Sequence, residues 1–223
     1  MSLPRVPEPK ILSPLDEAQA YESMDHTTVN RQFVDDLLEG DRPVGPRVVD
    51  LGCGPAAIPI ELCQRVDSVE VLAIDAEIEM LEIAKREIDI AGMLDRITLH
   101  HADACVLKEY EEGIADTVIS NSMLHHLDEP QDGLQGAARL LREGGRMFIR
   151  DLARPSSAEE IENLVSQYAG DESETSQQLF RQSLHAALTL DEIRDLAGGF
   201  GISPADVQMT SDRHWTVDWC SQH

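Results

Sequence analysis

Short runs of β-branched and aliphatic residues alternate along most of the chain with longer stretches in which apolar residues recur every three or four positions. The short runs predict buried strands, and the longer stretches predict amphipathic helices. This alternation is typical of βαβ units, in which helices cover a parallel sheet. We therefore expect an α/β fold, a three-layer sandwich built on a mostly parallel sheet.

The glycines and prolines between these runs place the expected elements. Strands are expected at residues 47–51, 69–74, 97–100, 117–120 and 147–150, and a last strand around Trp215 and Trp219. Helices are expected at residues 27–38 and 56–65, over Leu81, Ala84 and Ile88, and over Leu134, Ala138 and Leu141. Ser157 with Glu160, and Thr189 with Glu192, have the spacing of helix capping boxes. The second of these starts a closing helix over Ile193 and Leu196, and the stretch between the fifth strand and that helix predicts an irregular insert.

Charge and length restrict the classes of function. The chain has 223 residues, enough for one large domain, and 42 acidic against 18 basic residues give a formal net charge of −24. A surface this negative repels phosphate backbones and anionic membranes, so we expect neither nucleic acid nor membrane as a partner. No apolar run approaches the length of about 18 residues that a membrane-spanning helix needs. The proline-rich residues 1–20 predict an extended leader without the apolar core of a signal peptide.

The cysteines indicate a compartment and exclude one kind of site. Cys53, Cys63, Cys105 and Cys220 are scattered and form no C-x-x-C pair. That scatter favours reduced thiols in the cytoplasm over a disulfide framework or a zinc site. We therefore expect a cytoplasmic protein and assign no residue to a metal.

The most informative stretch runs from Val48 to Ala57, where a strand is expected to end and a helix to begin. Glycines at such a turn let a ligand approach the backbone, and the helix offers free N–H groups. Gly52, Gly54 and Ala57 also fit the G-x-G-x-x-A pattern of a dinucleotide site. Asp50, two residues before the first glycine, opposes a pyrophosphate and suits a cationic ligand.

The order of several motifs resembles that of class I S-adenosylmethionine-dependent methyltransferases. Over roughly residues 20–150, the matching segments are Asp50-Leu51-Gly52-Cys53-Gly54, Ile74-Asp75-Ala76 with Met80-Leu81, His101-Ala102-Asp103-Ala104, Asn121 to Leu127, and Arg142 to Met147. The resemblance implies a Rossmann-like methyltransferase fold with seven strands, the last of them antiparallel. It also implies one domain over residues 21–223, with lid elements at about 21–40 and 153–188.

The resemblance further implies S-adenosyl-L-methionine as the cofactor and a role for each matching residue. Gly52 and Gly54 would take the methionine part against the backbone, with Asp50 holding the turn and the amino group. Asp75 would accept hydrogen bonds from the ribose hydroxyls. The remaining residues expected at the cofactor are Ala76 and Met80 beside the adenine, Asp103 and Ala104 at its amino group, Asn121 near the methionine amino group, and Tyr21 closing over it.

The expected reaction is methyl transfer to a small-molecule acceptor. A non-catalytic S-adenosylmethionine-binding protein is the first alternative, and an NAD-type oxidoreductase the second. No catalytic residue is assigned, although His126 is the first candidate for mutation because an imidazole titrates near neutral pH. Its neighbour His125 is expected to point away from it, so the two are not expected to share a metal.

Overall fold

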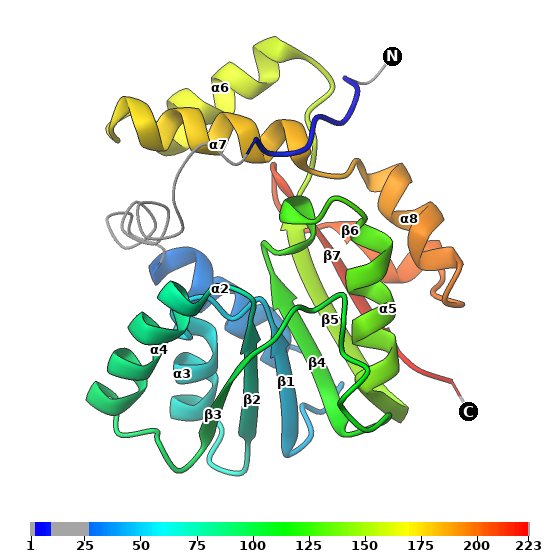
Figure 1. The fold of residues 1–223 in the computed structure, drawn as a ribbon. Coiled ribbons are helices and arrows are strands. Elements are labelled where there is room, and N and C mark those ends of the chain that lie inside the picture. The colour runs from blue at the N-terminus through cyan, green and yellow to red at the C-terminus, as the bar shows by residue number, and fades with distance from the viewer. Residues whose placement is uncertain (1–2, 10–26, 223) are drawn as a thin grey trace. The chain divides into compact units, whose positions relative to one another are not determined.

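The computed structural model describes residues 3–9 and 27–222. A seven-stranded sheet has the order β3-β2-β1-β4-β5-β7-β6 (Figure 1). The elements, in chain order, are α2 (Thr27–Leu38), β1 (Arg47–Leu51), α3 (Ala57–Arg65), β2 (Glu70–Asp75), α4 (Ile78–Ile90), β3 (Ile97–His101), β4 (Ala115–Asn121), the 3₁₀-helix η1 (Leu124–His126), α5 (Pro130–Leu140), β5 (Leu141–Leu152), α6 (Ala158–Ala169), α7 (Glu174–Ala186), α8 (Leu190–Gly198), η2 (Pro204–Asp206), β6 (Val207–Met209) and β7 (His214–Cys220).

The expected α/β architecture is confirmed, and its mostly parallel sheet is present. β1 pairs in parallel with β2 and β4, and β2 pairs in parallel with β3. The last strand of the chain, β7, pairs antiparallel with β6. None of the helices in the described part of the chain is long and apolar enough to cross a bilayer.

Two expectations about the later part of the chain are wrong. The region expected to be an irregular insert holds two helices, α6 and α7, each begun by a serine that accepts an N–H from the first turn. The fifth strand is also much longer than expected, since β5 starts at Leu141 and runs through Gly144 and Gly145. Of the two expected capping boxes, the one at Thr189 and Glu192 is complete. At Ser157 only the serine half forms, because the Glu160 carboxylate bonds Ser156 instead.

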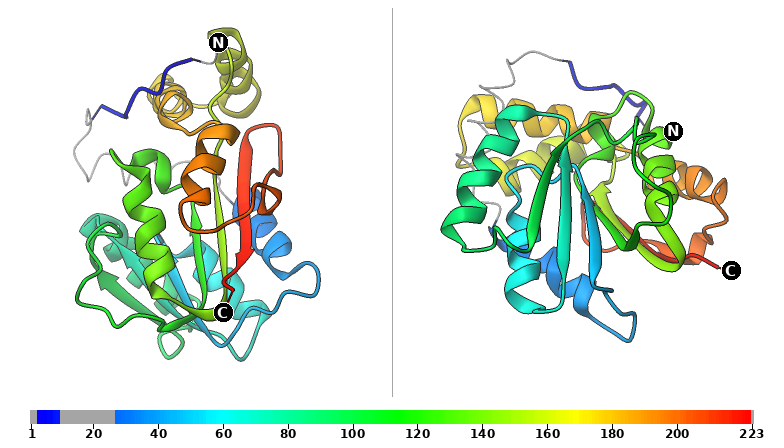
Figure 2. Two further views of the ribbon diagram at one scale, coloured as in Figure 1. Left: turned by 90° about the vertical axis from the view of Figure 1, so that its right-hand side faces the viewer. Right: turned by 60° about the horizontal axis from the view of Figure 1, so that its bottom comes forward.

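The described residues fall into two compact units. The first, here the core unit, comprises residues 27–121, 132–149 and 218–222, and the second unit comprises residues 3–9, 122–131 and 150–217. In the core unit, β1 to β4 lie side by side, and Figure 2 shows α2 and α5 on opposite faces of these strands. This gives the core unit the helix–sheet–helix layering of a parallel α/β fold.

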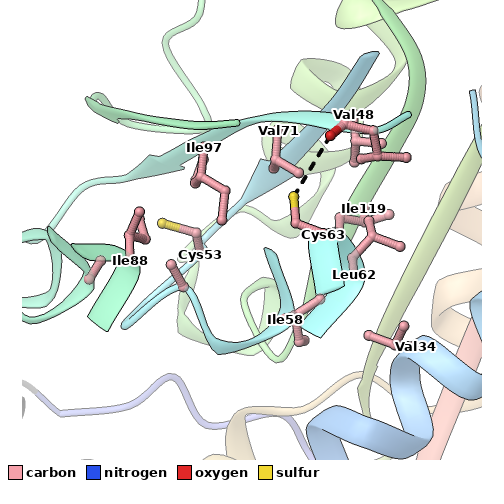
Figure 3. Close-up of a cluster of buried hydrophobic side chains, with 14 of the residues drawn as sticks. Val34, Val48, Cys53, Ile58, Leu62, Cys63, Val71, Ile88, Ile97 and Ile119 are labelled. Carbon is pink, nitrogen blue, oxygen red and sulfur yellow. Dashed lines mark hydrogen bonds between the residues drawn. The ribbon is translucent and has the colours of Figure 1, made fainter. Parts of the chain in front are cut away.

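The apolar periodicity of the helices explains the core of the core unit. Val34 of α2, Leu62 of α3 and Ile88 of α4 are buried against strand residues that include Val71 and Ile119 (Figure 3). Cys63 is also in this cluster, and its thiol lies 3.9 Å from the Val69 carbonyl oxygen. Nearly all residues of β1 and β4 are buried, as expected for central strands covered on both faces.

The second unit has a smaller core of its own. Ile161 and Val165 of α6 pack with Leu184 of α7, and Leu3 of the amino-terminal segment lies against this cluster. The Arg154 guanidinium reinforces the attachment of that segment, because its Nε donates to the Leu3 carbonyl oxygen at 2.9 Å. Residues 3–9 form neither helix nor strand.

Candidate functional site

The parallel pairing of the core unit brings four strand ends to one edge. Asp50 of β1 is in register with Ala73 of β2, and Asp75 of β2 is in register with His101 of β3. In an open parallel sheet, this carboxyl edge is where ligands bind. Nine of the ten residues expected at the cofactor belong to the core unit, and they lie on these strands or just after them: Asp50, Gly52, Gly54, Asp75, Ala76, Met80, Asp103, Ala104 and Asn121. The tenth, Tyr21, lies outside the described residues.

The turn after β1 is held open by its glycines and tied to the end of β2. Gly52 and Gly54 have φ angles of 72° and 51°, a region that glycine enters without steric cost. The amides of Gly52 and Cys53 donate to the Ile74 carbonyl oxygen at 2.9 and 3.1 Å. A Cβ atom placed on Gly54 would meet nothing within 4 Å, so the backbone is open on that side. A ligand can therefore lie directly against this turn.

Asp75 is oriented by backbone groups on both sides. Its Oδ2 accepts the Gly54 amide at 2.7 Å, and its Oδ1 accepts the Glu77 amide at 2.9 Å. A carboxylate has about four acceptor positions, so two of them stay available after these bonds. The arrangement places a fixed, half-buried carboxylate beside the turn, suited to vicinal hydroxyl groups.

Asp50 is the buried acid of the site, with only 2% of its surface exposed. Burial disfavours its charged form, and the charge of Asp75 adds to this, so that the pKa of Asp50 rises to about 8. A cation bound near the turn would reverse that balance and favour the carboxylate. Cys53 lies between the two glycines, and burial raises the pKa of its thiol, which makes it an unreactive packing group.

The outer part of the edge holds the remaining expected residues. Asp103 is exposed, and its Oδ1 accepts the Cys105 amide at 2.8 Å, while Ala104 is buried. The Ala76 carbonyl oxygen is 2.9 Å from His101 Nε2. His101 belongs to one of the matching segments but was given no role at the cofactor, and its pairing with the end of β2 brings it to this loop.

Asn121 ends β4 with an unusual feature. Its side-chain Oδ1 is buried and has no hydrogen-bond partner among the described residues. Buried polar atoms are nearly always paired, so an orphaned acceptor at a site edge indicates a missing donor. The next residue, Ser122, has a φ of 58°, a backbone conformation that non-glycine residues adopt rarely and mostly at functional sites.

In the second unit, the two adjacent histidines do not behave as the sequence predicted. The centroids of their rings lie 4.1 Å apart and the ring planes are tilted by 36°, so the two side chains lie against each other rather than pointing apart. Each ring is held by a different carboxylate, His125 by Asp151 and His126 by Glu8. His125, not His126, is the buried member, and its Nδ1 lies 2.5 Å from Oδ1 of the buried Asp151. Sequence reasoning missed Glu8, whose Oε2 lies 2.5 Å from His126 Nδ1.

Both carboxylates of this cluster are held in their charged form. Burial alone would raise the pKa of Glu8, but the hydrogen bond from His126 and the nearby histidines outweigh it and lower the pKa to about 2. Burial likewise opposes the charge of Asp151, whose pKa is nonetheless lowered by the charge and hydrogen bond of His125.

The proteins that this chain is similar to agree with the geometry of the glycine turn and its neighbouring acids. A family model described as a methyltransferase domain matches residues 48–145. The 27-O-demethylrifamycin SV methyltransferase of Amycolatopsis mediterranei is 29% identical over 81% of this chain and 64% of its own length. The chain thus spans less than two thirds of the length of the curated relatives that it matches.

Solved structures share the fold at low sequence identity. A SAM-dependent methyltransferase from Aquifex aeolicus superposes with a TM-score of 0.68 at 16% identity, covering 94% of this chain and 98% of that one. The plantazolicin methyltransferase BamL, solved with a desmethylplantazolicin analogue and SAH, gives a TM-score of 0.62 at 16% identity, covering 87% of this chain and 69% of that one. The family match therefore identifies residues 48–145, which include the glycine turn and its acidic neighbours, as a methyltransferase domain, and the solved structures share the fold of the chain.

Proposed function

We propose that this protein transfers a methyl group from S-adenosyl-L-methionine to a small-molecule acceptor. The observation that carries the proposal is the buried Asp50 beside Asp75 at the mouth of an open glycine turn. Such a pair of acids favours a cationic nucleoside, and S-adenosylmethionine carries both a sulfonium and an ammonium group. When bound, this cofactor supplies an activated methyl group.

The residues present fit that cofactor. The orphaned Oδ1 of Asn121 provides an acceptor for an ammonium group, and the open side of Gly54 provides space against the backbone. The two unused acceptor positions of Asp75 suit the ribose hydroxyls. Asp103, Ala104, Ala76 and Met80 would line the adenine end. The residues of the chain then bind the cofactor, orient it toward the acceptor and exclude water. Such positioning accounts for much of the catalysis in transfers of this kind.

A small-molecule acceptor is supported by the charge of the chain and by a relative. The net charge of −24 opposes a nucleic acid, and the Amycolatopsis relative is named for a small-molecule substrate. We infer that acceptor specificity belongs to the second unit, where α6 and α7 form a separate cluster. A cytoplasmic location belongs to the same proposal, supported by the four unpaired cysteines.

The two alternatives differ in what they would bind or do. An NAD-type oxidoreductase would place a pyrophosphate at the turn, where Asp50 would repel it. A non-catalytic binding protein would hold the cofactor without transferring its methyl group.

Isothermal titration with S-adenosylmethionine, S-adenosylhomocysteine and NADH tests the proposal. We expect both sulfur nucleosides to bind with one-to-one stoichiometry and NADH not to bind. Binding of NADH with no binding of either sulfur nucleoside would overturn the assignment. Transfer of a labelled methyl group into a fractionated small-molecule extract then separates the enzyme from the binding protein.

A further inference from the structure

Three potential metal ligands of the second unit converge from two distant parts of the chain. Glu8 belongs to the amino-terminal segment, and His125 and His126 belong to η1. One ligand atom from each residue lies within 4.8 Å of the other two. Glu8 Oε1 is 3.9 Å from His125 Nε2, and Glu8 Oε2 is 2.5 Å from His126 Nδ1.

Asp151 fixes the ring of His125 in the tautomer that a metal requires. Both of its carboxyl oxygens accept backbone amides, those of Leu124 and His125 on Oδ2 and that of Leu152 on Oδ1, so the contact with His125 Nδ1 places the proton on that nitrogen. In the neutral imidazole, the lone pair is then on Nε2, the nitrogen that faces Glu8. Asp151 itself is immobilised, because its Oδ2 accepts the amides of Leu124 and His125 at 2.6 and 3.2 Å. A carboxylate behind a ligating histidine is a recurrent feature of metal sites.

Glu8 is held in place by contacts of its own and of its neighbours. Ser183 Oγ donates to Glu8 Oε1 at 2.5 Å. The Arg5 guanidinium donates to the carbonyl oxygens of Leu127 and Ala186, both at 2.6 Å, and the Val6 amide donates to the His185 carbonyl oxygen at 3.0 Å. The segment is therefore bound along its length, and Glu8 is delivered to the histidines by a fixed backbone.

We propose that Glu8, His125 and His126 form a binding site for a divalent transition-metal ion of the zinc class. Two imidazole nitrogens and one carboxylate oxygen are ligands that zinc accepts in proteins. In a tetrahedral site the ligand atoms lie roughly 3.3 Å apart, given metal–ligand bonds of about 2 Å. Glu8 Oε1 and His125 Nε2, at 3.9 Å, lie within 1 Å of that value, and a bound ion would replace the proton of the hydrogen bond between Glu8 Oε2 and His126 Nδ1.

The exposure of the cluster indicates an open coordination position. His125 is 4% exposed and Glu8 17%, whereas His126 is 49% exposed. A site with three protein ligands and one solvent-facing side is the arrangement in which zinc binds water or a ligand oxygen.

The test is a titration of the chelator-treated full chain with Zn²⁺ in an excess of Mg²⁺, which occupies exposed carboxylates. We expect one Zn²⁺ per chain in the wild type. Glu8→Gln and His126→Asn should each weaken binding at least tenfold, while the control variant His100→Asn, which removes an exposed histidine of β3, should bind as the wild type does.

A second measurement identifies the ligands. Co²⁺ in place of Zn²⁺ should give the strong visible absorption of a four-coordinate site, and this absorption should be lost in Glu8→Gln. Equal Zn²⁺ affinity in the wild type, Glu8→Gln and His126→Asn would overturn the proposal, as would the absence of stoichiometric binding. Circular dichroism of each variant confirms that lost binding does not reflect unfolding.

Discussion

Oδ2 of Asp75 lies 2.7 Å from the amide nitrogen of Gly54, so the acid at the end of β2 also holds the glycine turn that follows β1. One side chain thereby links the two segments that carry the cofactor motifs. The same oxygen atoms that orient the turn are those proposed to meet the ribose, which couples the shape of the turn to its ligand.

Replacing Asp75 should separate these two roles. Asp75→Ala removes both the ribose acceptor and the bond to Gly54, and hydrogen bonds to charged groups contribute about 1.5–3 kcal/mol. We expect the Kd for S-adenosylhomocysteine to rise by about 10- to 100-fold in calorimetry. Asp75→Asn keeps an oxygen that can accept the Gly54 amide, so it should lose less affinity for S-adenosylhomocysteine than Asp75→Ala does. The control Asp89→Asn, at an exposed position of α4, should leave the Kd unchanged, and an unchanged Kd in Asp75→Ala would contradict the ribose assignment.

Cofactor binding should release a proton from Asp50. In the ligand-free protein the pKa of Asp50 is raised to about 8 by burial and by Asp75, so the group is mostly protonated at pH 7. A bound cation favours the carboxylate and lowers this pKa, so affinity should fall as the pH drops from 7.5 to 6. Calorimetry in buffers of different ionisation enthalpy should detect close to one proton released at pH 7. Asp50→Asn should release none, and a wild type that also releases none would refute the role of Asp50.

Gly54→Ala tests the open side of the turn. The φ of 51° costs an alanine roughly 1–2 kcal/mol, and the new methyl group would enter the space left for the ligand. Gly92→Ala is a matched control, because Gly92 has a φ of 69°, equally open surroundings and a position after α4. Both variants should lose similar stability in urea titrations, while only Gly54→Ala should lose affinity for S-adenosylhomocysteine. Equal affinity in the two variants would show that no ligand approaches Gly54.

Arg146 should matter for stability and not for the ligand. This buried guanidinium bonds both carboxylate oxygens of Asp218, at 2.8 and 3.1 Å, and donates to the carbonyl oxygens of Leu37 and Arg42. Arg146→Met removes these bonds and should lower the free energy of unfolding by about 2–4 kcal/mol in urea denaturation. Arg86→Met, which breaks an exposed ion pair with Glu87, should change the free energy of unfolding by less than about 0.5 kcal/mol. A similar loss in both variants would mean that the buried network contributes little.

The sequence alone determined the strand–helix alternation and the positions of the cofactor motifs. These follow from local rules: side-chain periodicity marks strands and helices, and a turn with positive φ angles requires the glycines at positions 52 and 54. Since parallel strands end at one edge, the acids at positions 50, 75 and 103 could be expected to form a common site. The protonation of Asp50 could not, because it depends on burial by residues that are remote in the chain.

Only the tertiary structure decided which histidine is buried and what it contacts. Glu8 and His126 are separated by 118 positions, and no local periodicity encodes a contact over that distance. The close approach of the two imidazoles accompanies their contacts with Glu8 and Asp151, and the tautomer of His125 depends on Asp151 from the distant strand β5. Contacts of this kind arise when segments that are distant in the sequence pack together, so only the tertiary structure shows them.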